Sequence, residues 1–505
     1  MQGSGTTMSV WMEASGWLES HKADIGSHVE VVVIGAGIAG LTTAHLLQRE
    51  GRQVLVLDDG PVGSGETSRT TAHLSNAIDD RFSEMERIHG MDGSRLAAES
   101  HGAAIDRIEA IIRDEGIDCD FKRIDGYLIL AEGCPVDLID NELAAAHRAG
   151  LREVVRVERA PVPGFDRQPA LRFPRQGRFH VLKYLLGLAQ AFERRGGQIA
   201  SGTRVTGVDG GQPATVHLGD GRQLTADFVV CCTNSPLVDH YAIHTKQAPY
   251  RTYAIGIRVP KGAVPDALYW DTLDSYHYVR LQEEGDHDVL IVGGEDHKTG
   301  EATDMEQRYQ RLETWSRQHY PQCGDVLYRW SGQVLEPFDG LAFIGRDPGN
   351  NPNVLVATGD SGMGMTHGTI AGMLLTDLIQ GRDNPWAGLY DPTRQQTSTL
   401  GTWLQENLDV AKQMTDYILP GDVRSTDDIR AGQGAVMREG LRRVAVYRDD
   451  QDMIHRMSAV CPHLKCIVHW NPGEKSWDCP CHGSRFSAFG EVLNGPAASN
   501  LERLR

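Results

Sequence analysis

The chain has 505 residues, of which 40% are hydrophobic and 23% are charged, with 56 Gly and 22 Pro. This composition is that of an ordinary globular protein, and it excludes a collagen-like fibre or a disordered scaffold. At roughly 100–200 residues per domain, the chain is long enough for about two to four domains. The net charge is −18. An acidic protein repels nucleic acid phosphates and anionic lipids, so we expect neither as a partner.

The N-terminal segment, residues 1–28, lacks the basic and apolar regions of a secretory signal. The most apolar stretch, residues 29–47, is interrupted by Glu30 and His45, so it is interpreted as a strand, a turn and a helix. These observations predict a cytoplasmic location without membrane insertion.

Residues 29–400 alternate short apolar strands with amphipathic helical stretches, a pattern typical of an α/β domain with additional antiparallel strands. The expected strands are residues 31–34, 54–57, 128–130, 228–232, 289–292 and 354–357. A polar segment, residues 401–420, is predicted to be a linker. Residues 421–505 contain short strands, including 444–447, and form a β-rich module with 12 basic and 11 acidic residues. The body that precedes the linker therefore carries nearly all of the negative charge.

The first expected strand leads into a GxGxxG turn and a helix, with Gly35, Gly37, Ile38, Ala39 and Gly40 in the turn. Gly35 permits a tight turn, Gly37 lets the backbone approach a pyrophosphate, and Gly40 allows the helix to pack closely on the strand. The second strand ends at Asp58 and Asp59, where a carboxylate is placed to bind a ribose hydroxyl. This context favours a dinucleotide site over a glycine turn that serves packing alone.

Two further segments favour FAD over NAD. One follows the second strand and includes Arg69, Thr70, Thr71 and Ala72; the other is glycine-rich and spans residues 357–368. With these segments, residues 29–395 resemble flavoproteins of the glycine/D-amino acid oxidase (DAO) family. The resemblance implies a Rossmann-like FAD-binding domain, an antiparallel-sheet substrate domain and non-covalent FAD. The further cofactor residues that it implies are Val205, Thr233, Asn234, Gly359, Gly362, Met363, Gly364, Met365 and Thr366.

Cysteines and histidines cluster near the C-terminus in the order C-x-H, fifteen residues, C-x2-H. Each half supplies one thiolate and one imidazole, from Cys461 and His463 and from Cys479 and His482. Such a set suits a [2Fe–2S] cluster in which two cysteines hold one iron and two histidines hold the other. Zinc is the alternative, but zinc fingers usually separate a cysteine pair from a histidine pair.

This motif resembles a Rieske domain of the respiratory type, which implies a disulfide between Cys466 and Cys481. Two residues depart from the family pattern. Lys465 stands where the family usually has glycine, and Phe486 stands where high-potential members have a tyrosine directed at a cluster thiolate. Ser484 is retained. Because hydrogen bonds to sulfur raise the reduction potential, we expect an intermediate-to-low potential.

The complete chain resembles bacterial FAD-dependent oxidoreductases with a fused Rieske domain. That resemblance implies oxidation of an amine or amino acid to an imine, with electrons passing from flavin to the cluster and on to an external acceptor, either a protein or oxygen. Tyr276, Tyr278 and Arg280 alternate along an expected strand, and Arg280 is a candidate clamp for a substrate carboxylate. Trp330, His73 and His367 are further pocket candidates by position alone. We assign Arg280, Tyr278 and Trp330 as the catalytic candidates.

Two alternative functions remain. The first is an electron-transfer reductase or carrier that serves a separate partner enzyme, although only one dinucleotide site is evident. The second is a Rieske oxygenase, for which Asp239, His240 and His244 are possible ligands of a catalytic iron. The C-terminal position of the Rieske motif argues against the oxygenase. Because all FAD segments precede residue 370 and all cluster ligands follow residue 460, we expect each half to fold alone.

Overall fold

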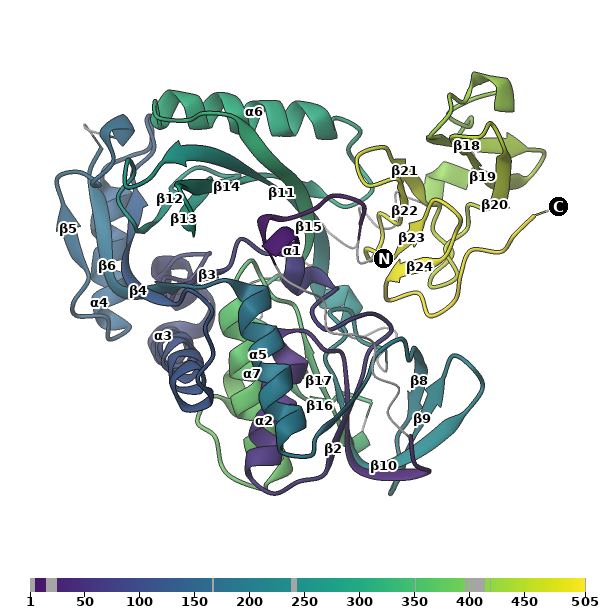
Figure 1. Ribbon diagram of the computed structural model, residues 1–505, viewed down its shortest axis with the longest axis horizontal. Helices are drawn as coiled ribbons and strands as arrows, with labels where there is room; N and C mark the ends of the chain where they lie inside the picture. Colours follow the sequence, from purple (N-terminus) through teal and green to yellow (C-terminus); the bar gives the residue numbers. More distant parts are fainter. Residues whose placement is uncertain are drawn as a thin grey trace.

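The structure is a computed structural model that describes residues 5–14, 25–165, 168–237, 243–349, 351–395, 399, 414–417 and 419–504. Two large sheets form the body, and two small sheets form a separate C-terminal domain (Figure 1). The expected fold class, an α/β FAD-binding part with an antiparallel-sheet part and a small β-rich domain, is confirmed.

The first large sheet has eight strands and contains the parallel pairs of the nucleotide-binding fold. Its order is β16-β17-β10-β1-β2-β7; in addition, β9 pairs with β10, and β8 pairs with β9. These strands are β16 (Phe343–Asp347), β17 (Asn351–Thr358), β10 (Gln223–Cys231), β1 (His28–Ile34), β2 (Val54–Leu57), β7 (Gln198–Ala200), β8 (Val205–Asp209) and β9 (Ala214–Leu218).

Both faces of this sheet are buried, which explains why its central strands are continuously apolar. In β1, Val31 and Val33 pack against helices, whereas Val32 and Ile34 pack toward β8 and β9. The helices that belong to the body are α1 (Val10–Ala14), α2 (Ile38–Arg49), α3 (Phe82–Glu115), α4 (Asp137–Arg148), α5 (Val181–Arg194), α6 (Met305–His319), α7 (Gly364–Ile379) and α8 (Ala387–Tyr390). Of these, α2, α5 and α7 pack side by side (Figure 1).

The second large sheet has nine strands in the order β15-β11-β14-β13-β12-β4-β6-β3, with β5 beside β6. All of its pairs are antiparallel except β12 with β4. The strands are β15 (Val326–Pro337), β11 (Gln247–Pro260), β14 (His287–Lys298), β13 (Tyr278–Glu284), β12 (Leu268–Asp271), β4 (Lys122–Ile129), β6 (Ala170–Arg178), β3 (His73–Leu74) and β5 (Val155–Val157).

Alternation along β11 separates a packed face from a cavity face. Tyr253, Ile255 and Ile257 pack in a hydrophobic core with residues of α6, whereas Thr252 and Ala254 line a cavity on the opposite side. The sheet therefore places side chains from several of its strands at one wall of the site.

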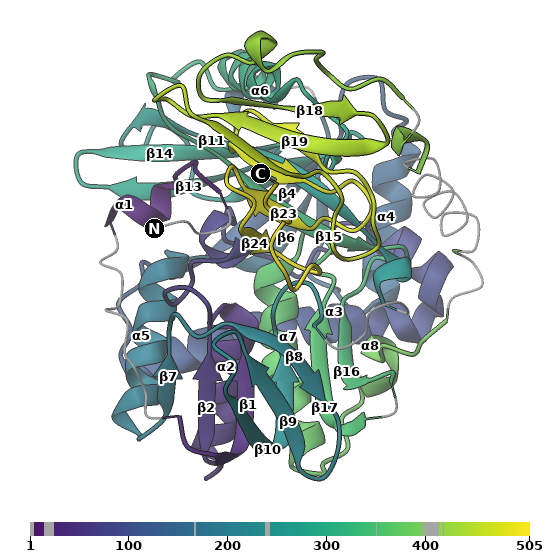
Figure 2. The ribbon, with the colours of Figure 1, turned by 90° about the vertical axis from the view of Figure 1, so that its right-hand side faces the viewer.

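The C-terminal domain consists of a three-stranded sheet, β18-β19-β20, and a four-stranded sheet, β21-β22-β23-β24. Their bounds are β18 (Gln433–Glu439), β19 (Arg442–Arg448), β20 (Ile454–Ser458), β21 (His469–Asn471), β22 (Ser476–Asp478), β23 (Arg485–Ser487) and β24 (Val492–Asn494). Figure 2 shows this domain in front of the nine-stranded sheet. Of the expected linker, residues 401–413 and 418 lie outside the described residues.

Sequence reasoning leaves residues 1–28 as an N-terminal segment outside both domains, but part of this segment is built into the core. Trp11 of α1 is fully buried and its Nε1 donates to the backbone oxygen of Thr70 at 2.6 Å. The Trp11 ring also covers the guanidinium of Arg280, whose Cζ lies 5.2 Å from the ring centroid. The N-terminal helix thus closes one side of the junction between the two sheets.

Candidate functional site

A cavity of about 640 Å³ lies where the two large sheets meet, and part of its wall comes from the C-terminal domain. Its lining includes Ile34 and Leu57 at the ends of β1 and β2, and Thr252, Tyr278 and Trp330 from the nine-stranded sheet. Ligands of parallel α/β sheets bind at these carboxyl ends of the strands. The cavity is therefore the candidate site for both the nucleotide and the substrate.

The glycine turn fits a dinucleotide because its backbone leaves no room for side chains. A Cβ on Gly35, whose φ is +109°, would lie 2.3 Å from the backbone oxygen of Cys232. A Cβ on Gly40 would lie 1.9 Å from the backbone oxygen of Gly35, and Gly40 itself does not line the cavity. Gly35, Gly37, Ile38 and Ala39 do line it, at the N-terminus of α2. The turn thus presents bare backbone and the positive end of a helix to an anion.

Asp58 and Asp59 lie beside this turn and both line the cavity. The Asp58 carboxylate accepts hydrogen bonds from the backbone N–H of Ala36 at 2.6 Å and of Gly60 at 2.8 Å. Burial raises the pKa of Asp58 to about 7. Asp58 therefore supports the glycine turn through these hydrogen bonds and also faces the cavity.

The remaining cofactor candidates are divided between the cavity wall and the packing behind it. Arg69, Thr70, Thr71, Val205, Thr233, Asn234, Gly359, Gly362, Met363, Gly364 and Met365 line the cavity. Ala72 and Thr366 do not. Ala72 is buried behind Thr70, whose hydroxyl accepts from its backbone N–H at 3.0 Å, and the Thr366 hydroxyl lies 2.8 Å from His101 Nδ1. These two residues support the wall without facing the cavity.

Tyr278, Trp330, Tyr276 and His73 are brought together at the end of the cavity formed by the nine-stranded sheet. The Tyr278 ring lies 5.5 Å from Tyr276 and 5.7 Å from His73, measured between centroids. Burial lowers the pKa of His73 to about 3, so its imidazole is neutral at pH 7. Trp330 donates through Nε1 to the backbone oxygen of Arg69 at 2.8 Å.

Arg280 and His367 do not have the positions expected of substrate-binding groups. The guanidinium of Arg280 is fully buried outside the cavity, where it donates to the backbone oxygens of Ala72 at 2.8 Å and Phe179 at 3.0 Å. Alternation correctly puts Arg280 on the side of Tyr278, but the cavity ends before it because α1 covers that position. His367 lines the cavity, yet its ring is held by the backbone oxygen of Asp360 at 2.9 Å.

The four expected cluster ligands converge from two loops of the C-terminal domain. The Cys461 and Cys479 thiols are close enough to share a hydrogen bond, and the His463 and His482 ring centroids lie 5.1 Å apart. His482 Nδ1 is buried and has no hydrogen-bond partner within the part of the chain that the structure describes. A pair of adjacent thiols and a pair of adjacent imidazoles fit the ligand set of a Rieske cluster, and iron would use the His482 nitrogen that is otherwise unpaired.

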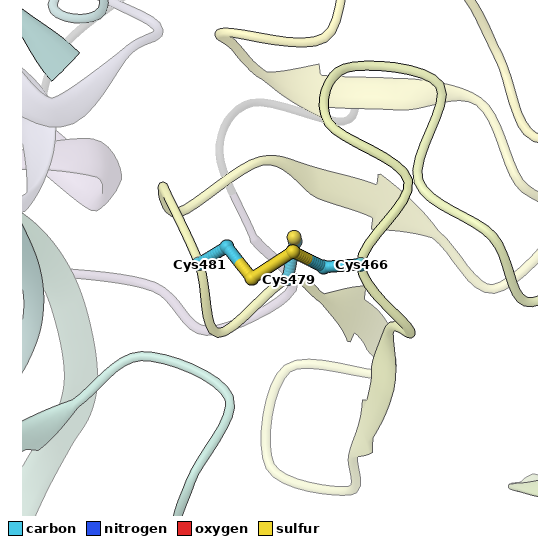
Figure 3. Close-up of side chains that lie close together, drawn as sticks. All are labelled: Cys466, Cys479 and Cys481. Atoms are coloured by element: carbon cyan, nitrogen blue, oxygen red, sulfur yellow. A yellow bond between two sulfur atoms is a disulfide. The ribbon is translucent and has the colours of Figure 1, made fainter. Parts of the chain in front are cut away.

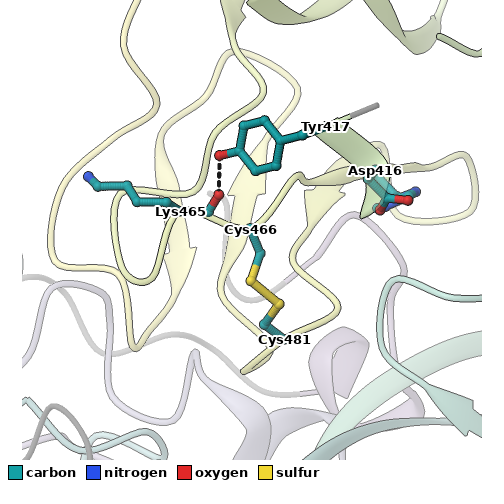
Figure 4. The surroundings of a disulfide bond; sticks show 6 residues. Asp416, Tyr417, Lys465, Cys466 and Cys481 are labelled. Carbon is teal, nitrogen blue, oxygen red and sulfur yellow. Dashed lines mark hydrogen bonds and ion pairs between the residues drawn. A yellow bond between two sulfur atoms is a disulfide. The ribbon is translucent and has the colours of Figure 1, made fainter. Parts of the chain in front are cut away.

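The expected disulfide is confirmed, since Cys466 and Cys481 are bonded with Cα atoms 6.5 Å apart. Figure 3 shows that the Cys479 sulfur lies beside this bond, within 4.8 Å of both of its sulfurs. These three sulfurs are not a metal site of their own, because two of them are bonded to each other. Lys465 adopts φ +65°, a left-handed conformation that explains why glycine is usual at this position, and Tyr417 donates to its backbone oxygen (Figure 4).

The C-terminal domain is joined to the body through a buried charge network that the sequence gives no means of finding. The Glu474 carboxylate accepts from Thr6 N–H at 2.7 Å and from the Ser331 hydroxyl at 2.5 Å, and lies 3.3–3.4 Å from Arg251 and Arg69. Burial alone would raise the pKa of Glu474, but the guanidiniums of Arg69, Arg251 and Arg485 and the Ser331 hydrogen bond outweigh burial and lower the pKa to about 2. Arg69, a cofactor candidate by sequence, thus serves this contact.

The loops that carry the cluster ligands rest directly on the wall of the cavity. Gln333 lines the cavity and donates through Nε2 to the backbone oxygen of Gly483, next to His482, at 3.0 Å. His244 of the body is buried against both cluster histidines, at 5.2 Å from His463 and 6.1 Å from His482 between ring centroids. In addition, Glu491, Val492, Leu493, Asn494, Gly495 and Ala497 line the cavity.

Of the three iron ligands considered for an oxygenase, the structure describes only His244. Asp239 and His240 lie outside the described residues. His244 faces His463 and His482 of the C-terminal domain.

Among the described residues, no helix combines the length and apolar character needed to cross a bilayer.

Comparisons with known proteins agree with both halves of this description. Residues 30–378 match the family model described as FAD dependent oxidoreductase (DAO), and residues 420–505 match that of the Rieske [2Fe-2S] domain. YhfW of Bacillus subtilis (strain 168), named as a Rieske 2Fe-2S iron-sulfur protein, is 31% identical over 94% of this chain and 93% of its own. Gamma-glutamylputrescine oxidoreductase of Escherichia coli (strain K12) is 26% identical over 70% of this chain and 84% of its own.

Solved structures share the fold of the body at low sequence identity. Glycine oxidase from Geobacillus kaustophilus matches with a TM-score of 0.60 and 16% identity, over 73% of this chain and all of that chain. L-proline dehydrogenase from P. horikoshii matches with a TM-score of 0.59 and 20% identity, over 73% of this chain and 98% of that chain.

Proposed function

Because the chain belongs to the DAO family of FAD-dependent oxidoreductases and ends in a Rieske [2Fe-2S] domain, we propose that it oxidises an amine or amino acid and passes the electrons to its own cluster. Its cofactors are FAD and the Rieske [2Fe-2S] cluster. An external acceptor then takes the electrons from the cluster. The observation that carries the proposal is the contact of Gln333 with both the cavity and the cluster loop.

When bound, FAD would supply the two-electron oxidation of the carbon next to the amine nitrogen, which gives up a hydride while the nitrogen gives up a proton, and it would allow the two electrons to be passed singly to the cluster. The product is an imine, which water hydrolyses to a carbonyl compound and ammonia when the amine is primary. The chain's own residues hold the cofactor at the glycine turn and enclose the substrate between Tyr276, Tyr278 and Trp330. Such enclosure excludes water from the reacting carbon.

The short connection between cavity and cluster supports internal electron transfer. Gln333 lies on β15, His244 on the 3-10 turn η3 (His244–Lys246), and both contact the loops that carry His463 and His482. The contact of both histidines with His244 of the body supports electron transfer from flavin to cluster within one chain. A separate reductase function would instead need a second nucleotide site.

Anaerobic bleaching of the FAD-loaded protein tests this proposal. We expect at least one member of a panel of amines and amino acids to bleach the flavin, and NADH and NADPH to leave it oxidised. The control is a chain with Gly40→Ala, which should not retain FAD because the new Cβ meets the Gly35 backbone oxygen. Bleaching by a nicotinamide nucleotide without bleaching by any amine would show a reductase instead.

A further inference from the structure

Acidic residues outnumber basic residues in the lining of the cavity. Eight acidic residues line it, against two arginines among the described residues. The acidic residues are Asp58, Asp59, Glu66, Asp79, Asp296, Glu336, Asp360 and Glu491, and the arginines are Arg69 and Arg204. A site that selects a substrate by a carboxylate would need a cationic partner for it.

Neither arginine is placed to bind a substrate carboxylate. The Arg69 guanidinium donates to the backbone oxygen of Ser331 at 2.8 Å and to the Thr7 hydroxyl at 2.9 Å, and lies against Glu474. Arg204 lies at the nucleotide end, beside Val205, and donates to the backbone oxygen of Ala498 at 3.0 Å. The end of the cavity nearest the nine-stranded sheet therefore contains acids without a matching cation.

Two of these acids belong to that end of the cavity. Asp79 lies beside Tyr276 at the Gly362 turn, where a Cβ on Gly362 would meet Asp79 Oδ2 at 2.5 Å and Tyr276 Oη at 3.7 Å. Asp296 lies on β14 next to Thr252, whose hydroxyl is 2.6 Å from Tyr278 Oη. Both carboxyls thus border the aromatic group of Tyr276, Tyr278 and Trp330.

Among the described residues neither carboxyl forms an ion pair: the Tyr276 hydroxyl hydrogen-bonds to Asp79 and the Thr252 hydroxyl to Asp296, while Arg81 and Arg308 act on them only from a distance. Burial and, to a lesser degree, neighbouring Asp80 raise the pKa of Asp79 to about 8, and burial raises that of Asp296 to about 6. Asp296 Oδ1 is buried and has no hydrogen-bond partner among the described residues. Buried carboxyls of this kind are stabilised by a cation or an N–H donor, and a ligand is the partner that the cavity leaves room for.

We propose that the substrate is a diamine or polyamine whose distal ammonium group is held by Asp79 and Asp296, while its other, neutral amine end is oxidised. This proposal rests on the proposed function, because it assumes that an amine reduces the flavin. The rings of Tyr276, Tyr278 and Trp330 enclose the methylene chain and provide faces for a cation. An amino acid is disfavoured because its carboxylate would face Asp79 and Asp296 without a guanidinium.

Three probes of equal chain length test the charge preference on the FAD-loaded protein under anaerobic conditions. Putrescine carries an ammonium at its far end, butylamine a methyl group and 4-aminobutyrate a carboxylate. We expect putrescine to bleach the flavin at a half-saturating concentration at least about tenfold below that of butylamine, because a charge-assisted hydrogen bond contributes roughly one to two powers of ten in affinity. 4-Aminobutyrate should be the poorest of the three.

Charge-neutralising variants connect the preference to the named residues. Asp79→Asn and Asp296→Asn should each raise the half-saturating concentration of putrescine by a factor about tenfold or more larger than the factor for butylamine, so that the preference for putrescine is lost. Asp274→Asn is the matched control, because it removes the same charge from an exposed position in the loop that leads to Tyr276. The control should behave as the unmodified protein toward all three probes.

Calorimetry gives a readout that a structural role of Asp79 would not change. The reacting amine of putrescine and that of butylamine both give up a proton to bind in the neutral form; because the Asp79 carboxyl is largely protonated at pH 7 and must ionise to pair with the distal ammonium, putrescine binding should release more protons to the buffer than butylamine binding, and Asp79→Asn should remove this difference. If 4-aminobutyrate or butylamine bleaches the flavin as well as putrescine does, or if both Asn variants lose all three probes equally, the charge preference is wrong. If no amine bleaches the flavin, the proposed function itself fails.

Discussion

Phe486 is the residue through which the cluster potential is most directly adjusted. Its side chain is fully buried in the same hydrophobic cluster as the ligands Cys461 and Cys479. Phe486→Tyr should raise the reduction potential of the cluster, since a hydroxyl there offers a donor to a ligand sulfur. Protein-film voltammetry or a redox titration measures the change. A potential that is unchanged or lower would show that the new hydroxyl does not reach a thiolate.

At the scale of single residues, the local motifs are predictable and the extent of the cavity is not. The glycine turn and the Cys/His pairs are local features whose spacing indicates their chemistry without knowledge of the fold. Arg280 illustrates the opposite case. The alternation of side chains along a strand correctly groups Arg280 with Tyr276 and Tyr278. Only the packing of the folded chain reveals that Trp11 covers Arg280 and separates it from the cavity.

Among the elements, the turn between β21 and β22 carries the residue on which the domain contact depends. Glu474→Ala should lower the free energy of unfolding by about 3–5 kcal/mol, because it leaves Arg69 and Arg251 buried without their counter-charge. Glu502→Ala, an exposed acid of the same domain, should change stability by less than about 0.5 kcal/mol. Urea unfolding followed by tryptophan fluorescence compares them. Equal effects of the two variants would contradict a role for Glu474 in the contact.

The lowered pKa of Glu474 determines how this residue makes the free energy of unfolding depend on pH. The folded-state pKa of Glu474 is about 2, below its ordinary value of 4.5, so its contribution is present above pH 4.5 and is lost as the pH falls toward 2. The contribution is on the order of 3 kcal/mol at neutral pH. Glu474→Gln should therefore flatten the loss of stability between pH 4.5 and 2 relative to the unmodified chain. Parallel pH profiles for the two proteins would contradict this assignment.

Hydrophobic periodicity predicts the helices and strands whose own residues form a clear apolar pattern. Strand β2 is predicted with its observed bounds because four apolar residues stand between turns. Helix α1 is not predicted, because five residues carry too little periodic pattern, and its burial depends on contacts with Thr70 and Arg280 far along the chain. Long-range contacts of this kind leave no trace in a local pattern.

For the whole molecule, the sequence predicts two halves that each fold alone, whereas in the structure both halves contribute residues to the wall of the cavity. Residues 491–495 and Ala497 of the C-terminal domain contribute to the cavity lining, and Asn494 donates to Glu66 at 2.7 Å. A chain ending at residue 395 should therefore bind FAD more weakly and unfold at a lower temperature than the full chain. Flavin release on dilution and thermal unfolding measure both effects. If the shortened chain has the same FAD affinity and unfolding temperature as the full chain, the two halves fold and function independently.

The central claim is that electrons pass from the flavin to the cluster within one chain. The most direct measurement mixes the fully loaded protein anaerobically with an amine that bleaches it and follows flavin absorbance together with the electron-paramagnetic-resonance signal of the reduced cluster. We predict that the cluster signal rises at a rate independent of protein concentration, and that His482→Ala, which removes a proposed iron ligand, keeps flavin bleaching but gives no signal. A cluster that stays oxidised while the flavin is reduced, or a rate that grows with protein concentration, would contradict the claim.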